Sequence, residues 1–409
     1  MSTATAPSRD ALRARTAVYA SFTLNGFALA SWIARIPSAR DALGLSLGDL
    51  GLLLLAGSIG SVATMPAAGA LVMRFGRVRT VTAGGAAVAS GLLLVALAVD
   101  GLATVWPAAV GLVVVGAGIA TWDVAMNVEG AAVERRLDRA IMSRFHAAFS
   151  FGTVLAAGLA VLLLRLGVPT WVHLCGAAAL AAVGSAGAAR AFLRSPSAAE
   201  AASAGQGIGL GRAWREPRTL LIGLMVLCMA FVEGSASDWL AVGLGDGYGT
   251  SHDVGVAGFA VFVAAMTTGR LLGPVLLERF GRVAALRGCA ALAEAGVLLF
   301  VLAPSVPLAV VGAAAWGVGA SLGFPLGMSA AADEEVNAAA RVSVVSSVGY
   351  AAFLAGPPLL GQLGDRVGVL TALLAAAVAA AVALVLSGVA RPHADGTALS
   401  SERTPVRSS

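Results

Sequence analysis

Long apolar stretches separated by short polar segments run along the whole chain. A membrane-crossing helix needs about 20 mostly apolar residues, and these stretches are of that length. They are too long and too uniformly apolar for barrel strands, so we expect an all-α membrane protein. The pattern predicts twelve transmembrane helices, at 16–36, 48–73, 80–99, 104–128, 145–165, 170–193, 219–243, 254–277, 283–303, 307–331, 342–364 and 369–389.

A hydrophilic segment divides these spans into two sets of six. Residues 194–218 are rich in Ala, Ser and Gly and contain several arginines, as is typical of a linker. We therefore expect one six-helix bundle over 16–193 and a second over 219–389. A polar segment, 1–15, precedes the first bundle, and a disordered polar tail is predicted for 390–409.

Two short motifs recur at nearly the same offset. Arg-Phe-Gly-Arg-Val at 74–78 returns 205 residues later at 279–283, and His-Ala-Ala-Phe-Ser-Phe-Gly at 146–152 resembles Tyr-Ala-Ala-Phe-Leu-Ala-Gly at 350–356, 204 residues later. Two independent matches at nearly one offset indicate a duplicated six-helix unit. The two bundles should therefore be pseudo-symmetric.

Composition narrows the class of protein further. The chain is 58% apolar and 12% charged, whereas a soluble domain carries about 25% charged residues. A pI of 9.8 would suit nucleic-acid binding, but no basic run is interleaved with aromatic residues. The three cysteines lie in apolar segments without metal-ligand spacing, and no phosphate-binding loop or nucleophile–base pair is present. We expect no enzyme, no metal and no cofactor.

The basic residues are all arginines, and their distribution predicts an orientation. With the N-terminus inside the cell, 22 of the 27 arginines fall in cytoplasmic segments, four fall outside and Arg270 lies within a span. Short cytoplasmic loops are enriched in basic residues. This distribution predicts a multi-pass protein of the inner membrane with both termini and the linker in the cytoplasm.

The loop after the second span resembles the signature of the major facilitator superfamily, Gly-x-x-x-Asp-Arg-x-Gly-Arg. Met73 replaces the acid in the first copy, and Pro274 replaces the first glycine in the second. The resemblance covers about residues 14–390 and implies a carrier in which these loops gate the cytoplasmic end. The matching positions are Gly69, Arg74, Gly76 and Arg77 in the first half and Glu278, Arg279, Gly281 and Arg282 in the second.

A finer resemblance is to the fucose-permease-like branch, which includes MosC-type and YbjJ-type membrane proteins. It rests on two stretches: Asn25-Gly26-Phe27 through Ile36-Pro37, and Asp123-Val124-Ala125-Met126-Asn127. The second stretch looks like the acid-x-Ala-x-Asn pattern of that branch. The resemblance implies that Asp123 carries a proton. The acid that the sugar carriers have in the first helix is missing here, and Asn25 is the nearest polar candidate.

Polar residues at membrane depth are costly and mark candidate sites for substrate or protons. Asp123 and Asn127 share a helical face with small residues, and the alternative is a structural hydrogen-bond pair. Glu233 is expected past mid-membrane. It is a candidate substrate or proton site, and the alternative is a salt bridge that holds the halves together. Asn25 and Trp32 lie on one stripe, which predicts a binding wall, although Trp32 also suits an interfacial anchor. Arg270 is expected to snorkel to the inner interface.

These observations predict a monomeric secondary transporter in the lipid bilayer. Its cargo would be a small molecule, such as a sugar or related polar metabolite, and protons would drive it through alternating access. Two alternatives stay open at this point: an efflux carrier for drugs or metabolites, and a non-transporting membrane receptor or scaffold. Neither alternative involves nucleic acid.

Overall fold

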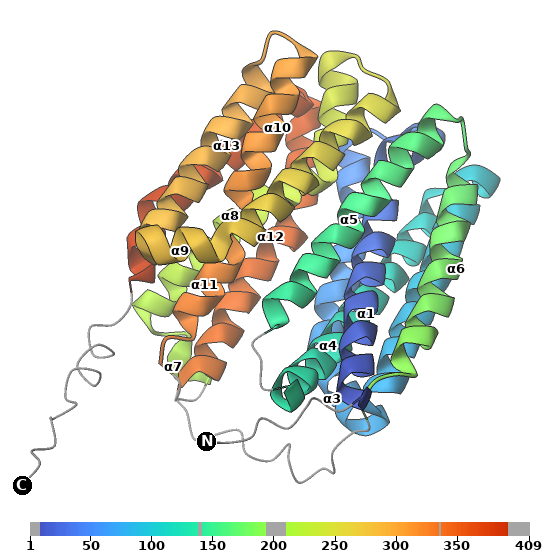
Figure 1. Cartoon of the computed structure of the whole chain (residues 1–409). Helices are drawn as coiled ribbons and strands as arrows, with labels where there is room; N and C mark the ends of the chain where they lie inside the picture. The colour runs from blue at the N-terminus through green and yellow to red at the C-terminus, as the bar shows by residue number, and fades with distance from the viewer. Residues whose placement is uncertain (1–8, 138–140, 194–209, 335–336, 392–409) are drawn as a thin grey trace, which may run out of the picture.

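The computed structural model describes residues 9–137, 141–193, 210–334 and 337–391, and this part of the chain is helical without strands (Figure 1). Most of the expected linker, the first eight residues and the tail beyond Arg391 lie outside the described residues. The first half contains α1 (Arg9–Ile33), α2 (Ile36–Leu43), α3 (Leu47–Ala96), α4 (Val105–Leu137), α5 (Met142–Arg165) and α6 (Thr170–Ala189). The second half contains α7 (Leu210–Ala213), α8 (Pro217–Val242), α9 (His252–Leu302), α10 (Val306–Ala320), α11 (Gly323–Ala331), α12 (Ala338–Val367) and α13 (Val369–Leu386).

Ten helical segments of the described chain are long and apolar enough to cross a membrane, whereas the sequence predicts twelve. The difference lies in α3 and α9, which have 50 and 51 residues. At 1.5 Å per residue, 50 residues of unbroken helix would extend about 75 Å, more than twice the thickness of the hydrocarbon core. Each is broken at one glycine of the repeated motif, Gly76 with φ 79° and Gly281 with φ 75°. Each therefore has room for two of the predicted spans.

One predicted span is divided in the structure, whereas α3 and α9 each combine two predicted spans. The stretch 307–331 is not one helix but two, α10 and α11, which are separated at Ser321 and Leu322. The Ser321 hydroxyl donates to the carbonyl of Val318 at 2.6 Å, a local bond that competes with the helical pattern. The break lies beside α9, where the Arg270 guanidinium donates to the Ser321 carbonyl at 3.4 Å.

Close glycine contacts hold each half together, and they repeat between the halves. A side chain at Gly111 of α4 would come within 2.9 Å of the Gly91 carbonyl of α3. In the second half, a side chain at Gly312 of α10 would come within 2.9 Å of the Gly296 carbonyl of α9. Small residues let membrane helices approach closely, where van der Waals contact stabilises the pair. Gly91 and Gly296 are 205 residues apart, the offset of the Arg-Phe-Gly-Arg-Val motif, so a neighbouring helix approaches the same position in both halves, as a duplicated unit predicts.

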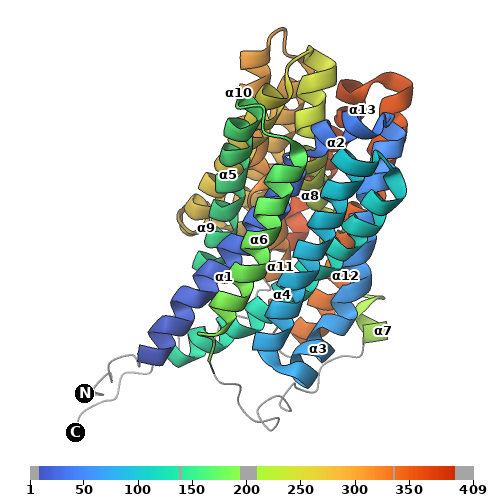
Figure 2. The ribbon, with the colours of Figure 1, turned by 90° about the vertical axis from the view of Figure 1, so that its right-hand side faces the viewer.

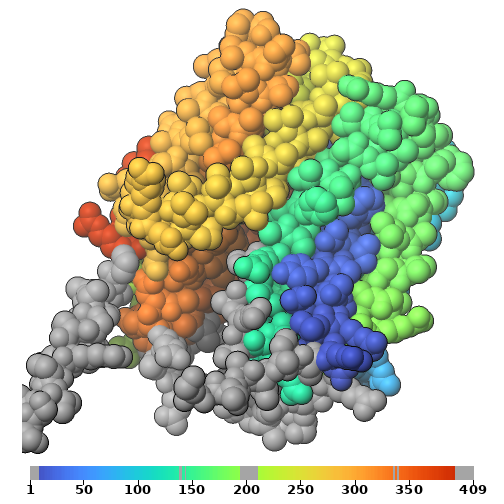
Figure 3. Space-filling view, viewed as in Figure 1, coloured from blue at the N-terminus to red at the C-terminus, as the bar shows by residue number. Residues whose placement is uncertain are grey.

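The two halves meet along α3 with α12 and along α5 with α9 (Figures 1, 2 and 3). Polar contacts between them gather at the end opposite the chain termini. There the Asp365 carboxylate of α12 accepts hydrogen bonds from the backbone amides of Leu47 and Gly48, both at 2.9 Å, at the start of α3. Three ion pairs also join the halves at this end: Arg40 with Asp246, Arg165 with Asp253, and His252 with Asp41.

At the end that carries the termini, the ion pairs of the described residues each lie within one half. They include Arg77 with Glu129 in the first half and Arg341 with Glu216 in the second. Among the described residues, the ion pairs that join the halves therefore all lie at the opposite end.

The α3–α12 contact yields a test of this conformation. A side chain at Gly51 of α3 would overlap the carbonyl of Pro357 on α12. We predict that Gly51→Val pushes the halves apart at the closed end. Spin labels at Ala42 and Leu302 should then show a longer distance by pulsed electron paramagnetic resonance.

The matched control for this experiment is Gly57→Ala in the same helix. The nearest atom to an added side-chain carbon at Gly57 is the Leu112 carbonyl oxygen at 3.7 Å, an ordinary contact. The control should leave the label distance unchanged. An unchanged distance in well-folded Gly51→Val protein would contradict the role of this contact in closure.

Candidate functional site

Asp123 and Asn127 lie one turn apart on α4, in half-buried positions. The Asn127 amide donates to the Asp123 carbonyl at 2.9 Å and to the Asp123 carboxylate at 3.2 Å. Among the described residues, no cation pairs with this carboxylate. It lies within electrostatic range of the Tyr350 hydroxyl of α12, in the other half. Asp123 thus has its predicted asparagine partner, and it faces the second half without a counter-charge.

The predicted stripe on α1 is buried in the first half. The Asn25 amide donates to the Ile119 carbonyl of α4 at 3.5 Å, one turn before Asp123, and the buried Asn25 side-chain oxygen has no hydrogen-bond partner among the described residues. Trp32 is only 5% exposed within the core, so it is not an interfacial anchor. Arg35 ends the stripe and donates to the His173 ring of α6 at 3.0 Å.

Glu233 of α8 forms an ion pair with Arg270 of α9, at 2.8 Å. The same guanidinium donates to the Ser150 hydroxyl of α5, in the first half, at 3.2 Å. The expectation that Arg270 snorkels to the interface is therefore wrong, because a carboxylate on the neighbouring helix is within direct reach. Glu233 does not bridge the halves itself; its partner Arg270 does so through Ser150.

His146 lies one turn before Ser150 and is exposed. Its ring packs edge-on against Phe22 at 5.2 Å, and it is within electrostatic range of Arg270. His146 and Tyr350 occupy equivalent positions of the repeated motif, one in each half. Two sets of polar residues thus each combine the two halves, with Asp123, Asn127 and Tyr350 in one set and His146, Ser150, Glu233 and Arg270 in the other. We call these seven residues together the central polar region.

The first motif loop contains a buried ion pair within its own half. Arg77 and Glu129 lie 3.0 Å apart, with side chains 6% and 0% exposed. The backbone of Leu193 completes the arrangement: its amide donates to Glu129 at 2.7 Å, and its carbonyl accepts from Arg77 at 3.2 Å. Arg77 follows the break in α3 at Gly76, and it contacts α4 through Glu129 and the end of the first half through Leu193.

The second motif loop repeats this arrangement with Asp333. Arg282 pairs with Asp333 at 2.8 Å, and Arg218 pairs with the same carboxylate at 3.1 Å. The sequence predicts Glu129 as a loop contact near the cytoplasmic end but pairs neither acid with its arginine, although a signal was available. Glu129 and Asp333 are 204 residues apart, the offset of the repeated motifs.

The other predicted gating residues are exposed and make local contacts. Arg74 and Arg279 each lie over the phenylalanine that follows them, at 5.3 and 5.4 Å from the ring centres. Glu278 is exposed without an ion pair among the described residues, and a side chain at Gly69 would meet open space. Gly76 and Gly281 form the breaks in α3 and α9. A latch that joins the halves through these loops stays a prediction.

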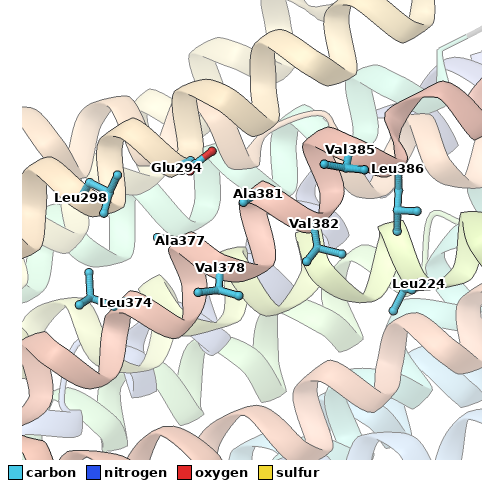
Figure 4. A pocket seen from close by; sticks show the side chains of 10 residues that line it. All are labelled: Leu224, Glu294, Leu298, Leu374, Ala377, Val378, Ala381, Val382, Val385 and Leu386. Atoms are coloured by element: carbon cyan, nitrogen blue, oxygen red, sulfur yellow. The ribbon is translucent and has the colours of Figure 1, made fainter.

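A groove of about 580 Å³ lies away from the central polar region, on the outer face of the second half (Figure 4). Leu224, Leu298 and the α13 side chains line it, and Glu294 is the acid among them. Val378 and Val385 at its edge are 65% and 81% exposed, as expected for a surface that faces lipid. No group of three or more potential metal ligands occurs among the described residues.

Comparison with known proteins identifies the family. A model of the Major Facilitator Superfamily matches residues 14–334 and, in an overlapping match, residues 240–408. The chain belongs to the Major Facilitator Superfamily. It is 32% identical over 346 residues to an uncharacterized MFS-type transporter of Yersinia pestis, covering 84% of this chain and 87% of that protein. It is 28% identical over 360 residues to the membrane protein MosC of Rhizobium meliloti, covering 88% and 86%.

Solved structures agree on the fold. A point mutant of the nucleoside transporter NupG matches with a TM-score of 0.74 at 14% identity, over 93% of this chain and 98% of that one. A point mutant of the E. coli fucose:proton symporter FucP matches with a TM-score of 0.66 at 17% identity, over 94% and 100%. This superfamily consists of multi-pass membrane transporters, so the predicted family and fold class are confirmed.

The buried pair in the first motif loop generates a stability prediction. Glu129→Gln would leave Arg77 charged in a buried site without its counter-charge. Removing one partner of a buried ion pair costs about 3–5 kcal/mol. We predict a loss of this size in the free energy of unfolding of the purified protein.

Glu134→Gln is the matched control, since Glu134 lies near the same end of α4 without an ion pair among the described residues. It should change the free energy of unfolding by less than about 1 kcal/mol. Equal losses in the two variants would show that the Arg77–Glu129 pair does not stabilise the first half.

Proposed function

We propose that this protein is a secondary active transporter that carries a small polar solute across the inner membrane together with protons. The observation that carries the proposal is the central polar region, in which groups of both halves meet at membrane depth. Ionisable residues at this depth usually mark the path of a substrate or an ion. Transporters of this architecture bind cargo between their two repeats and rock the repeats around it.

The proposed cargo is a sugar or a related polar metabolite. The structural neighbours include proteins named as a fucose:proton symporter, a D-xylose–proton symporter and a nucleoside transporter, whose cargo is rich in hydroxyl groups. Amide, hydroxyl and carboxylate groups of Asp123, Asn127 and Tyr350 suit hydrogen bonding to such a solute. The expectation of a monomer stays a prediction.

The proposed proton carrier is Asp123. An ionised carboxylate in a partly dry site without a cation is costly, so proton uptake stabilises it there. Exposure to water on the other side of the membrane would favour release. Asn127, which contacts the carboxylate, can hydrogen-bond to either protonation state or to the cargo.

The proposed orientation places both termini and the linker in the cytoplasm, with six-helix bundles over 16–193 and 219–389. The asymmetric distribution of arginines supports it. The polar contacts around Asp365 would then close the protein toward the outside, and the conformation would be open toward the cytoplasm. Arg74, Arg77, Arg279 and Arg282 would lie at the gate that closes when the halves rock.

The orientation is testable by labelling single cysteines in a cysteine-free background. A cysteine in place of Ser203 in the linker should react with a membrane-impermeant maleimide only after the cells are opened. A cysteine in place of Ala42, at the opposite end of the bundle, should react in intact cells and serves as the control. The reverse pattern would overturn the orientation.

The proton role predicts that Asp123→Asn separates two transport modes. The amide mimics a permanently protonated carboxyl, so proton-driven accumulation in proteoliposomes should be abolished. Exchange of cargo down its own gradient should continue, because the rocking motion does not need the proton. Full, pH-dependent accumulation by well-folded Asp123→Asn protein would contradict the role, and loss of exchange together with thermal stability would indicate a structural brace.

A further inference from the structure

Arg270 is the guanidinium of the central polar region, and its hydrogen bonds are incomplete. It donates to one carboxylate oxygen of Glu233 at 2.8 Å, to the Ser150 hydroxyl at 3.2 Å and to the Ser321 carbonyl at 3.4 Å. A guanidinium has five N–H donors, and it commonly binds a carboxylate through two parallel bonds. The Glu233–Arg270 pair uses one such bond. Arg270 thus retains donors for a second carboxylate.

The pair is also accessible, unlike the structural pair in the first motif loop. The side chains of Arg270 and Glu233 are 24% and 23% exposed, whereas those of Arg77 and Glu129 are 6% and 0% exposed. Ser150, the third partner, belongs to the opposite half. A ligand on Arg270 would therefore lie at the seam between α5 and α9 and contact both halves, as an alternating-access site requires.

The charges around Glu233 restrict what can bind there. Arg270 on α9 is its cation, and His146 on α5 lies within electrostatic range of Arg270. Asp123 on α4 is within electrostatic range of Tyr350 on α12, and Asp238 lies five residues after Glu233 on α8. Neither Asp123 nor Asp238 has a cation partner among the described residues. A carboxylate that takes the place of Glu233 on Arg270 leaves Glu233 without a cation at membrane depth, where uptake of a proton removes the cost of the charge.

We infer that the cargo carries a carboxylate, that this carboxylate replaces Glu233 on Arg270, and that the released Glu233 takes up one proton. The inference rests on the proposed transport function and names its substrate class: a small hydroxylated monocarboxylate, such as a sugar acid. One anion and one proton enter together, so the net charge of the region does not change. The cargo carboxylate accepts from Arg270, and Asn127 and Tyr350 remain available for its hydroxyl groups.

Two pH effects follow from this exchange. Binding takes up a proton, so the affinity for a sugar acid falls as the pH rises, by up to about tenfold per pH unit. Glu233→Gln removes both the competing carboxylate and the proton acceptor. That variant should bind the acid more tightly at pH 8 than the wild type and with little dependence on pH.

The test is calorimetry on the full-length protein in lipid nanodiscs between pH 6 and 8. The probes are matched pairs of an acid and a neutral compound: D-gluconate and D-glucitol, D-glucuronate and D-glucose, and L-fuconate and L-fucitol. We expect at least one acid to bind at least tenfold more tightly than its neutral partner. Titrations in buffers of different ionisation enthalpy should show uptake of about one proton, which Glu233→Gln abolishes.

Variants at Arg270 decide whether the guanidinium recognises the acid. Arg270→Gln should weaken binding of the acid at least tenfold. Because this variant leaves Glu233 unpaired, the double variant Arg270→Gln with Glu233→Gln provides a neutral pair that preserves packing, and it should fold without binding the acid. Arg366→Gln and Glu294→Gln, outside the central polar region, are charge-matched controls that should bind as the wild type does.

The outcomes separate this inference from the proposed function. A neutral sugar that binds and is exchanged in proteoliposomes independently of Arg270 overturns the inference and leaves transport intact. A wild-type protein that binds none of the acids also overturns it. If neither the acids nor the neutral sugars nor any other solute is exchanged, the proposed function fails as well.

Discussion

The cost of burying charge in a bilayer is the constraint on which this structure depends. The chain carries few charged residues, and several of those at membrane depth or at helix ends form ion pairs. Arg77 with Glu129 and Arg282 with Asp333 join motif loops to the ends of neighbouring helices. The Glu233–Arg270 pair joins α8 to α9 within the central polar region. Asp123 lies at membrane depth without a cation partner among the described residues, and such a carboxylate is the kind of group that a proton can neutralise.

The same constraint explains why the sequence predicts the fold well. Spans must be apolar over the thickness of the hydrocarbon core, so their number and approximate position can be predicted from the hydropathy pattern. The repeated Arg-Phe-Gly-Arg-Val motif coincides with the two breaks, because only glycine easily adopts the positive φ of Gly76 and Gly281. What hydropathy could not show is that a single non-helical glycine separates the two helices within α3 and within α9.

The site was harder to predict, because pairing depends on how helices are rotated and which of them touch. Asp123 and Asn127 were found because their partner lies four residues away on the same helix, where spacing fixes the geometry. Glu233 and Arg270 lie 37 residues apart on different helices, and the sequence does not say that they face each other. Ser150 and Tyr350 have ordinary polar side chains, and only the packing of α5 and α12 gives them their significance.

The strengths of the ion pairs also explain how the halves can move as units. The Arg77–Glu129 pair within the first half is almost fully buried, and breaking such a pair costs about 3–5 kcal/mol. The pairs that join the halves are more exposed: the Arg165 and Asp41 side chains are both 64% exposed, and the Asp246 side chain is 40% exposed. Exposed pairs contribute about 0–1 kcal/mol each, since water replaces the partner when they separate. Separation at the closed end therefore costs far less than deformation of a half, which favours rigid rocking of the halves over local unfolding.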